Sequence, residues 1–130
     1  MRICSAMRDV SLFFAALADE NRLRLLYLMK EGEICVCYLQ EVLQTNQPKI
    51  SRHLAYLKRA GLVEARRDGK WMHYRLRKLE PDFKKTLTNS LQHLGKLAQI
   101  KKDSQRLKQV LCCPERYGIS AFQSKREDCQ

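Results

Sequence analysis

The feature that most constrains the fold is a short turn between two helical patterns, followed directly by a hairpin pattern. Apolar residues at i, i+3 and i+7 predict a helix over residues 35–44. Thr45-Asn46 then forms the turn, and Pro48 falls in the first turn of a second helix, where its missing N–H is not needed. Gly61 ends that second helix. Two helices joined in this way form a helix-turn-helix.

A β-hairpin is predicted immediately after the helix-turn-helix. Residues 62–67 and 70–76 have strand composition and are joined by Asp68-Gly69, a dipeptide typical of tight hairpin turns. The order of elements predicts a winged helix-turn-helix, a mostly α fold with a β-hairpin wing. His73 in the second strand and His93 further along are expected at the surface.

Helices are also predicted on both sides of the winged helix, over residues 7–18, 20–31 and 82–111. The last would be about 45 Å long, and its apolar stripe is too extensive for a chain of this size to cover. We therefore expect a homodimer through the N- and C-terminal helices. The predicted organisation is a winged helix-turn-helix DNA-binding and dimerisation domain over residues 1–111, followed by a flexible, cysteine-containing C-terminal tail over residues 112–130.

The charge of the chain is unevenly distributed. Its formal net charge is +11, and residues 47–78 carry ten of the 25 basic residues but only two of the 14 acidic ones. A localised basic field is the electrostatic footprint of a nucleic-acid-binding surface. No apolar run approaches the length that spans a bilayer, and the first residues lack a signal-peptide pattern, so we expect a cytoplasmic protein without a membrane partner.

Four of the six cysteines stand in two closely spaced pairs, Cys35-Val36-Cys37 and Cys112-Cys113. Such spacings are poor for a disulfide within the pair and suited to chelation, and cysteines in a cytoplasmic chain more often bind metals or act in redox chemistry. No Gly-rich anion-binding loop follows any cysteine. A thiol enzyme is therefore not expected, although a nucleic-acid binder with inert buried cysteines remains an alternative.

Several segments together resemble the ArsR family of winged-helix metalloregulators, particularly the arsenic-responsive repressors of arsenical resistance operons. The resemblance covers about residues 8–80. It rests on residues 17–26 (LADENRLRLL), 33–39 (EICVCYL), 47–57, 61–63 (GLV) and 67–76 (RDGKWMHYRL).

The resemblance implies a homodimer that represses its operon in the apo form and loses DNA affinity when an inducer binds. It implies Cys35 and Cys37 as ligands of trivalent arsenic or antimony. The usual family motif is Glu-Leu-Cys-Val-Cys-Asp-Leu, in some members with a third cysteine three residues after the second. This chain has Tyr38 in place of the Asp and Gln40 at the position of the third cysteine.

The residues leave the rest of the ligand set open. Cys4, Cys112 or Cys113 could supply a third thiol, or a methylated trivalent arsenical could need only two. Cys112 and Cys113 could also form a separate two-thiol site. Cd(II), Pb(II) or thiol oxidation are alternative signals for the same repressor fold.

Helix geometry predicts a mechanism for the Cys35 and Cys37 pair. Residues i and i+2 do not face each other in a regular helix, whereas two sulfurs on one ion with metal–sulfur bonds of roughly 2.3 Å lie within roughly 4 Å of each other. The first turn of the predicted helix over residues 35–44 must therefore be, or become, non-helical. We expect inducer binding to deform this turn and move the next helix, the one after Thr45-Asn46, relative to its copy in the other subunit; this next helix is the predicted DNA-recognition helix.

The DNA-binding residues are predicted at the start of the recognition helix and at the hairpin. A major-groove helix reads bases from its exposed N-terminal end, and basic side chains on a wing contact the DNA backbone or minor groove. An imperfect palindrome of unknown sequence is the expected operator. The predicted residues are Gln47, Lys49, Ser51 and Arg52 on the helix and Arg66, Arg67 and Lys70 on the wing.

Overall fold

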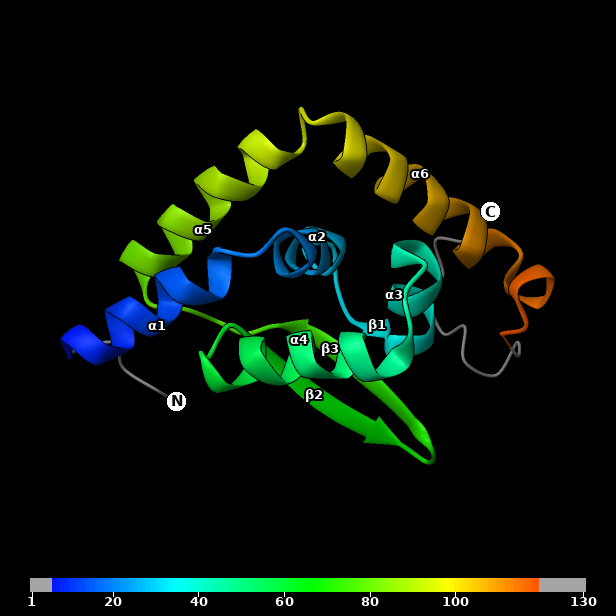
Figure 1. Ribbon diagram of the computed structural model, residues 1–130, viewed down its shortest axis with the longest axis horizontal. Coiled ribbons are helices and arrows are strands. Elements are labelled where there is room, and N and C mark those ends of the chain that lie inside the picture. Colours follow the sequence, from blue (N-terminus) through cyan, green and yellow to red (C-terminus); the bar gives the residue numbers. More distant parts are fainter. Residues whose placement is uncertain (1–5, 120–130) are drawn as a thin grey trace.

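The computed structural model describes residues 6–119 of the chain. Helices α5 and α6 form the two sides of an arch above α2, while α4 and a small sheet lie beneath (Figure 1). The elements in order are α1 (Met7–Leu17), α2 (Glu20–Leu28), β1 (Ile34–Cys35), α3 (Val36–Leu43), α4 (Gln47–Arg59), β2 (Val63–Asp68), β3 (Trp71–Leu76), α5 (Pro81–Leu94), α6 (Ala98–Cys112) and the 3-10 helix η1 (Pro114–Tyr117).

The predicted helix-turn-helix is confirmed as α3 and α4. Gln44 ends α3 in the left-handed conformation, with φ of 54°. Asn46 caps α4, because its side-chain oxygen accepts a hydrogen bond of 2.9 Å from the backbone N–H of Lys49. The inner face of α4 is fully buried at Ile50, Leu54 and Leu57, so the opposite face of this helix is left to solvent.

The predicted wing is also confirmed, with its turn one residue later than expected. Asp68 pairs with Trp71 across the hairpin, so the two turn residues are Gly69 and Lys70. Gly69 has φ of 63°, which a residue without a Cβ adopts at low cost.

The sheet contains a third strand that the sequence did not predict. Strand β1 pairs antiparallel with β3, so the strand order is β1-β3-β2. This pairing corrects the expected position of His73, which lies opposite Cys35 and is only 5% exposed. His73 lies between Cys35 on one side and Arg66 on the other in the same row of the sheet, and it is covered instead of standing at the surface.

The prediction of one long final helix is wrong. The chain breaks after α5 and resumes as α6, with Leu97 in an extended conformation at φ of −82° and ψ of 142°. The break lies against α2: a Cβ added to Gly95 would stand 2.9 Å from the Tyr27 hydroxyl oxygen. The apolar spacing runs on through this turn, and for that reason periodicity alone could not detect it.

Helix α6 turns back over α2 and α3 and is held there by polar contacts. Arg24 donates two hydrogen bonds to the Asp103 carboxylate, at 2.7 and 2.9 Å, and Asp103 is 3% exposed. Further along, Arg106 Nε donates to the backbone oxygen of Glu41 in α3 at 3.1 Å. The first contact attaches α6 to α2, and the second attaches it to α3, the helix that precedes α4.

Residues 112–119, which were predicted as part of a flexible tail, are described as structured. Helix α6 includes Cys112, η1 follows it, and Ile119 is buried at 5% exposure against the core. Residues 120–130, including Cys129, lie outside the described residues. None of the helices within residues 6–119 has the length and apolar character needed to cross a membrane.

We predict that Asp103→Asn lowers the free energy of unfolding by about 1–3 kcal/mol, because Arg24 loses a buried charged partner. Glu64→Gln breaks the exposed Arg75–Glu64 pair, whose side chains are 60% and 44% exposed, and is expected to cost less than about 1 kcal/mol. Urea unfolding of the two isosteric variants gives the comparison. Equal losses in both variants would contradict the role assigned to α6 docking.

Candidate thiol site and nucleic-acid interface

The two cysteines of the Cys-x-Cys pair lie on either side of the boundary between β1 and α3. Cys35 is the last residue of β1 and the N-cap of α3, with φ of −68° and ψ of 143°, and Cys37 lies in the first turn of α3. The change of backbone direction at Cys35 brings the two Sγ atoms to 2.9 Å. The helix predicted from about residue 35 begins at Val36 with Cys35 as its N-cap, so Cys35 is already non-helical in the absence of a ligand.

The close approach of the sulfurs divides the protonation of the pair unequally. The Cys37 thiol donates a hydrogen bond to the Cys35 sulfur, which lowers the pKa of Cys35 to about 7 against the opposing effect of its burial. The pKa of Cys37 is raised, because Cys37 holds its proton in the hydrogen bond to Cys35 and because its thiol is partly buried. Near neutral pH a substantial fraction of the molecules therefore carries a thiolate at Cys35 and a thiol at Cys37, and a thiophilic ligand that bonds both sulfurs must displace the remaining proton.

The donor set of this pair suits a soft ion or metalloid. Two sulfurs at 2.9 Å are within the roughly 4 Å that a shared ion with metal–sulfur bonds of about 2.3 Å allows. Thiolates favour such soft ligands over Mg²⁺ or Ca²⁺, which prefer oxygen. Within residues 6–119, no cluster of three His, Cys, Asp or Glu side chains is arranged to hold a metal ion.

The candidate third thiols do not join this pair in the part of the chain that is described. Cys4 lies outside the described residues. Gln40 lies in α3 three residues after Cys37. At this position, where the motif described above places a third cysteine in some members, the chain has an amide side chain. Within residues 6–119, Cys35 and Cys37 are therefore the two sulfurs that meet at this position.

Cys112 and Cys113 form a second thiol pair at the end of α6. Cys112 is exposed and Cys113 partly exposed. A hydrogen bond with the Cys112 sulfur, reinforced by the charge of that sulfur, raises the pKa of Cys113. Both pairs thus consist of sulfurs in mutual contact, but one is built into the β1–α3 boundary and the other lies at the C-terminal end of α6.

The predicted base-reading residues lie on the solvent side of α4. The recognition helix runs along the outside of the molecule beneath α2, beside the sheet (Figure 1). Its N-terminal half offers amide, ammonium, hydroxyl and guanidinium groups that face outward, as a major-groove helix requires. The exposed residues are Gln47, Lys49, Ser51 and Arg52.

The three predicted wing cations are not equivalent. Arg67 and Lys70 are exposed near the turn, with the Lys70 ammonium 5.0 Å from the centre of the Trp71 ring. Arg66 instead forms a bidentate ion pair with Glu33, with a shortest contact of 2.7 Å. Sequence reasoning missed Glu33 because the partners are 33 residues apart and no local pattern connects them.

Comparisons with known proteins agree with this architecture. The family model described as "Bacterial regulatory protein, arsR family" matches residues 19–65. A homodimeric winged helix-turn-helix DNA-binding domain from Mycobacterium bovis, described as a possible ArsR-family transcriptional regulator, is 31% identical and has a TM-score of 0.56 over 71% of this chain and 87% of that chain. The chain belongs to the ArsR family.

Curated relatives of this ArsR-family protein carry both arsenic and cadmium names. The arsenic resistance transcriptional regulator ArsR1 of Pseudomonas putida is 48% identical over 59% of this chain and 63% of that protein. The arsenical resistance operon repressor of Escherichia coli is 56% identical over 48% and 55%. The cadmium resistance regulatory protein CadC of Listeria innocua is 38% identical over 55% and 61%. The chain thus spans less than two thirds of each of these relatives.

We predict that Cys37→Ala slows alkylation of Cys35 by iodoacetamide at pH 7. Loss of the Cys37 hydrogen bond removes the main cause that lowers the pKa of Cys35, so its thiolate should form only at higher pH, by about one to two pH units. Mass spectrometry of the Cys35 peptide across a pH series measures the midpoint. Cys112→Ala is the control and should leave the midpoint of Cys35 alkylation unchanged. An unchanged midpoint in Cys37→Ala would contradict the claim that a hydrogen bond from Cys37 lowers the pKa of Cys35.

Proposed function

We propose that this ArsR-family protein is a transcriptional repressor that binds operator DNA in the apo form and is released when trivalent arsenic or antimony binds Cys35 and Cys37. The carrying observation is the pair of sulfurs 2.9 Å apart at the start of α3, the helix that precedes the recognition helix. The names of the arsenical relatives from Pseudomonas putida and Escherichia coli support the same ligand.

The chemistry of the pair favours a metalloid that forms stable bonds to sulfur. Trivalent arsenic prefers three thiolates, and a monomethylated arsenical needs two. The two-thiol geometry of Cys35 and Cys37 suits the methylated species directly. An inorganic ion would recruit one more thiol, with Cys4 as the candidate from outside the described residues.

A second candidate signal keeps the same repressor mechanism. The cadmium name of the Listeria innocua relative favours Cd(II), and thiolates also accept Pb(II). Oxidation is the third option, because the lowered pKa of Cys35, about 7, leaves part of this thiol ionised near neutral pH. Cys112 and Cys113 are proposed as a separate two-thiol site that binds the same class of soft ligand.

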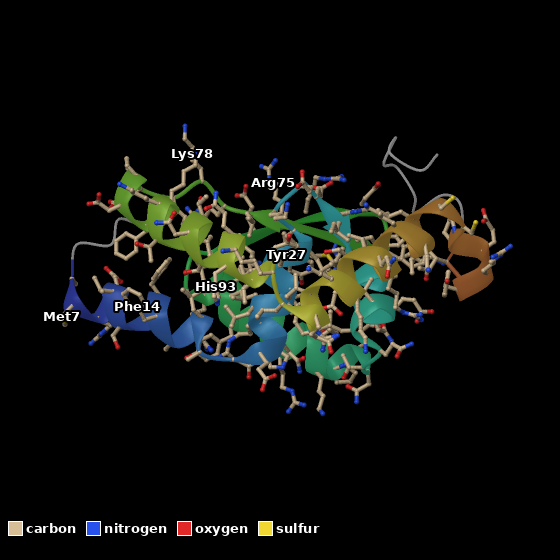
Figure 2. The ribbon with its side chains drawn as sticks, turned by 90° about the horizontal axis from the view of Figure 1, so that it is seen from above. Met7, Phe14, Tyr27, Arg75, Lys78 and His93 are labelled. Atoms are coloured by element: carbon tan, nitrogen blue, oxygen red, sulfur yellow. The ribbon has the colours of Figure 1, made fainter. Side chains whose placement is uncertain are left out.

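The proposed active species is a homodimer through α1 and α5 that acts in the cytoplasm. Helix α1 packs on α5 through Phe13 and Phe83, whose ring centres are 4.7 Å apart. The side chains of Met7 and Phe14, also in α1, are 83% and 52% exposed and lie at one end of the molecule (Figure 2). A partner subunit would cover them and place two copies of α4 about one helical turn of DNA apart, to match a palindromic operator.

We predict that saturating arsenite weakens operator binding by about 5–150-fold, the usual range of allosteric coupling. Cys35→Ser and Cys37→Ser should each lose this response, because one thiol cannot chelate. The matched control is the double variant Cys112→Ser with Cys113→Ser, which should keep it. Fluorescence anisotropy with a labelled operator duplex gives the affinities. Arsenite that binds the protein without changing operator affinity would sink the proposal.

We predict different effects from Arg52 on α4 and Arg67 on the wing. Arg52→Ala should relax discrimination at one base pair by about 1–3 kcal/mol, whereas Arg67→Ala should weaken operator and random DNA alike and reduce the salt slope by about 1. Competition binding at several salt concentrations separates the two. If Arg52→Ala weakens operator and random DNA equally, its assignment as a base-reading residue is wrong.

A further inference from the structure

One row of residues crosses the whole sheet from the thiol site to the wing. Cys35 in β1 lies opposite His73 in β3, and His73 lies opposite Arg66 in β2. Directly opposed residues in antiparallel strands project from the same face. Strand β1, which carries Cys35, is an edge strand of the same sheet that forms the wing.

A side-chain contact crosses this sheet in addition to the backbone ladder. Glu33, just before β1, accepts hydrogen bonds from Arg66 Nε at 3.1 and 3.2 Å and from Arg66 Nη2 at 2.7 Å. Because β3 lies between the two partners, the ion pair bridges the central strand. Arg66 lowers the pKa of the Glu33 carboxyl, which therefore stays ionised at neutral pH.

The form of this ion pair suits a positioning role more than a stabilising one. The Arg66 and Glu33 side chains are 49% and 29% exposed, and pairs this exposed contribute little to folding. A bidentate contact nevertheless fixes the direction of a planar guanidinium, which a single contact does not. Glu33 thus determines where the Arg66 charge points on the face of the wing.

We propose that Glu33 is a positioning residue that holds Arg66 in its pose for the DNA backbone and transmits the state of the thiol site to the wing. This inference rests on the proposed function of the Cys35 and Cys37 pair. Glu33 is two residues from Cys35 on the same short segment, so a ligand that moves β1 also moves the carboxylate. Arg66 then loses the pose that serves DNA binding.

The neighbouring pair Arg75–Glu64 provides a matched control. Arg75 Nε donates to Glu64 at 2.8 Å, and this pair lies within the β2–β3 hairpin. The Arg75 charge also contributes to the lowered pKa of the Glu33 carboxyl, but Glu64→Gln leaves the Glu33–Arg66 pair itself intact. Arg75 projects at the edge of the molecule near the sheet (Figure 2). Glu64→Gln and Glu33→Gln each remove one negative charge from the same sheet face, so their effects on long-range attraction of DNA are matched.

The experiment measures operator affinity with and without saturating arsenite for the wild type, Glu33→Gln and Glu64→Gln, and arsenite affinity without DNA. In Glu64→Gln the ratio of the two operator affinities should equal that of the wild type. In Glu33→Gln the ratio should fall by about threefold or more, a part of the usual coupling range, while arsenite affinity of the free protein stays unchanged. Arg66→Lys keeps the charge, loses the bidentate contact and should show the same smaller ratio.

Three results would overturn the inference. A wild-type ratio in Glu33→Gln would mean that the backbone ladder alone carries the coupling. Tighter apo binding in Glu33→Gln than in Glu64→Gln, with the ratio retained, would mean that Glu33 only competes with DNA for Arg66. A wild type without any arsenite effect would overturn the proposed function, and this inference with it, which distinguishes that failure from the other two.

Discussion

The geometry of the thiol site depends on Cys35, which is both the last residue of strand β1 and the N-cap of helix α3. Pairing with His73 holds Cys35 in the extended conformation as the last residue of β1, and α3 begins at the next residue. The sharp change of direction there brings the two sulfurs to 2.9 Å. One residue thus joins the wing sheet, the helix-turn-helix and the thiol chemistry.

The surrounding helices hold this joint from the other side. Helix α6 contacts α2 through Arg24 and Asp103, and α3 through Arg106 and Glu41. Because α3 is held between α6 and the sheet, it has little freedom to move when a ligand bonds both sulfurs. The less constrained part is β1, which has two residues and one neighbouring strand.

Local patterns predicted most of the fold, and long-range contacts account for what they missed. Helix spacing, Pro48 in the first turn of α4 and the Asp68-Gly69 dipeptide are encoded within a few residues, and α3, α4 and the wing follow from them. Strand β1 is too short to show any periodicity, so the burial of His73 was missed with it. The turn at Gly95 packs close to Tyr27 of α2, a distant residue in the sequence, and Glu33 meets Arg66 only after the sheet forms. The thiol pair was predicted from its spacing, but its preformed geometry was not.

The central claim is that a thiol ligand acts through β1 and the sheet while α3 stays folded. Amide hydrogen exchange with and without arsenite tests it most directly, because exchange reports local opening segment by segment. The account predicts that protection changes at residues 33–35 and 64–67, while the second half of α3, residues 40–43, keeps its protection. Loss of protection along α3 with an unchanged sheet would contradict it.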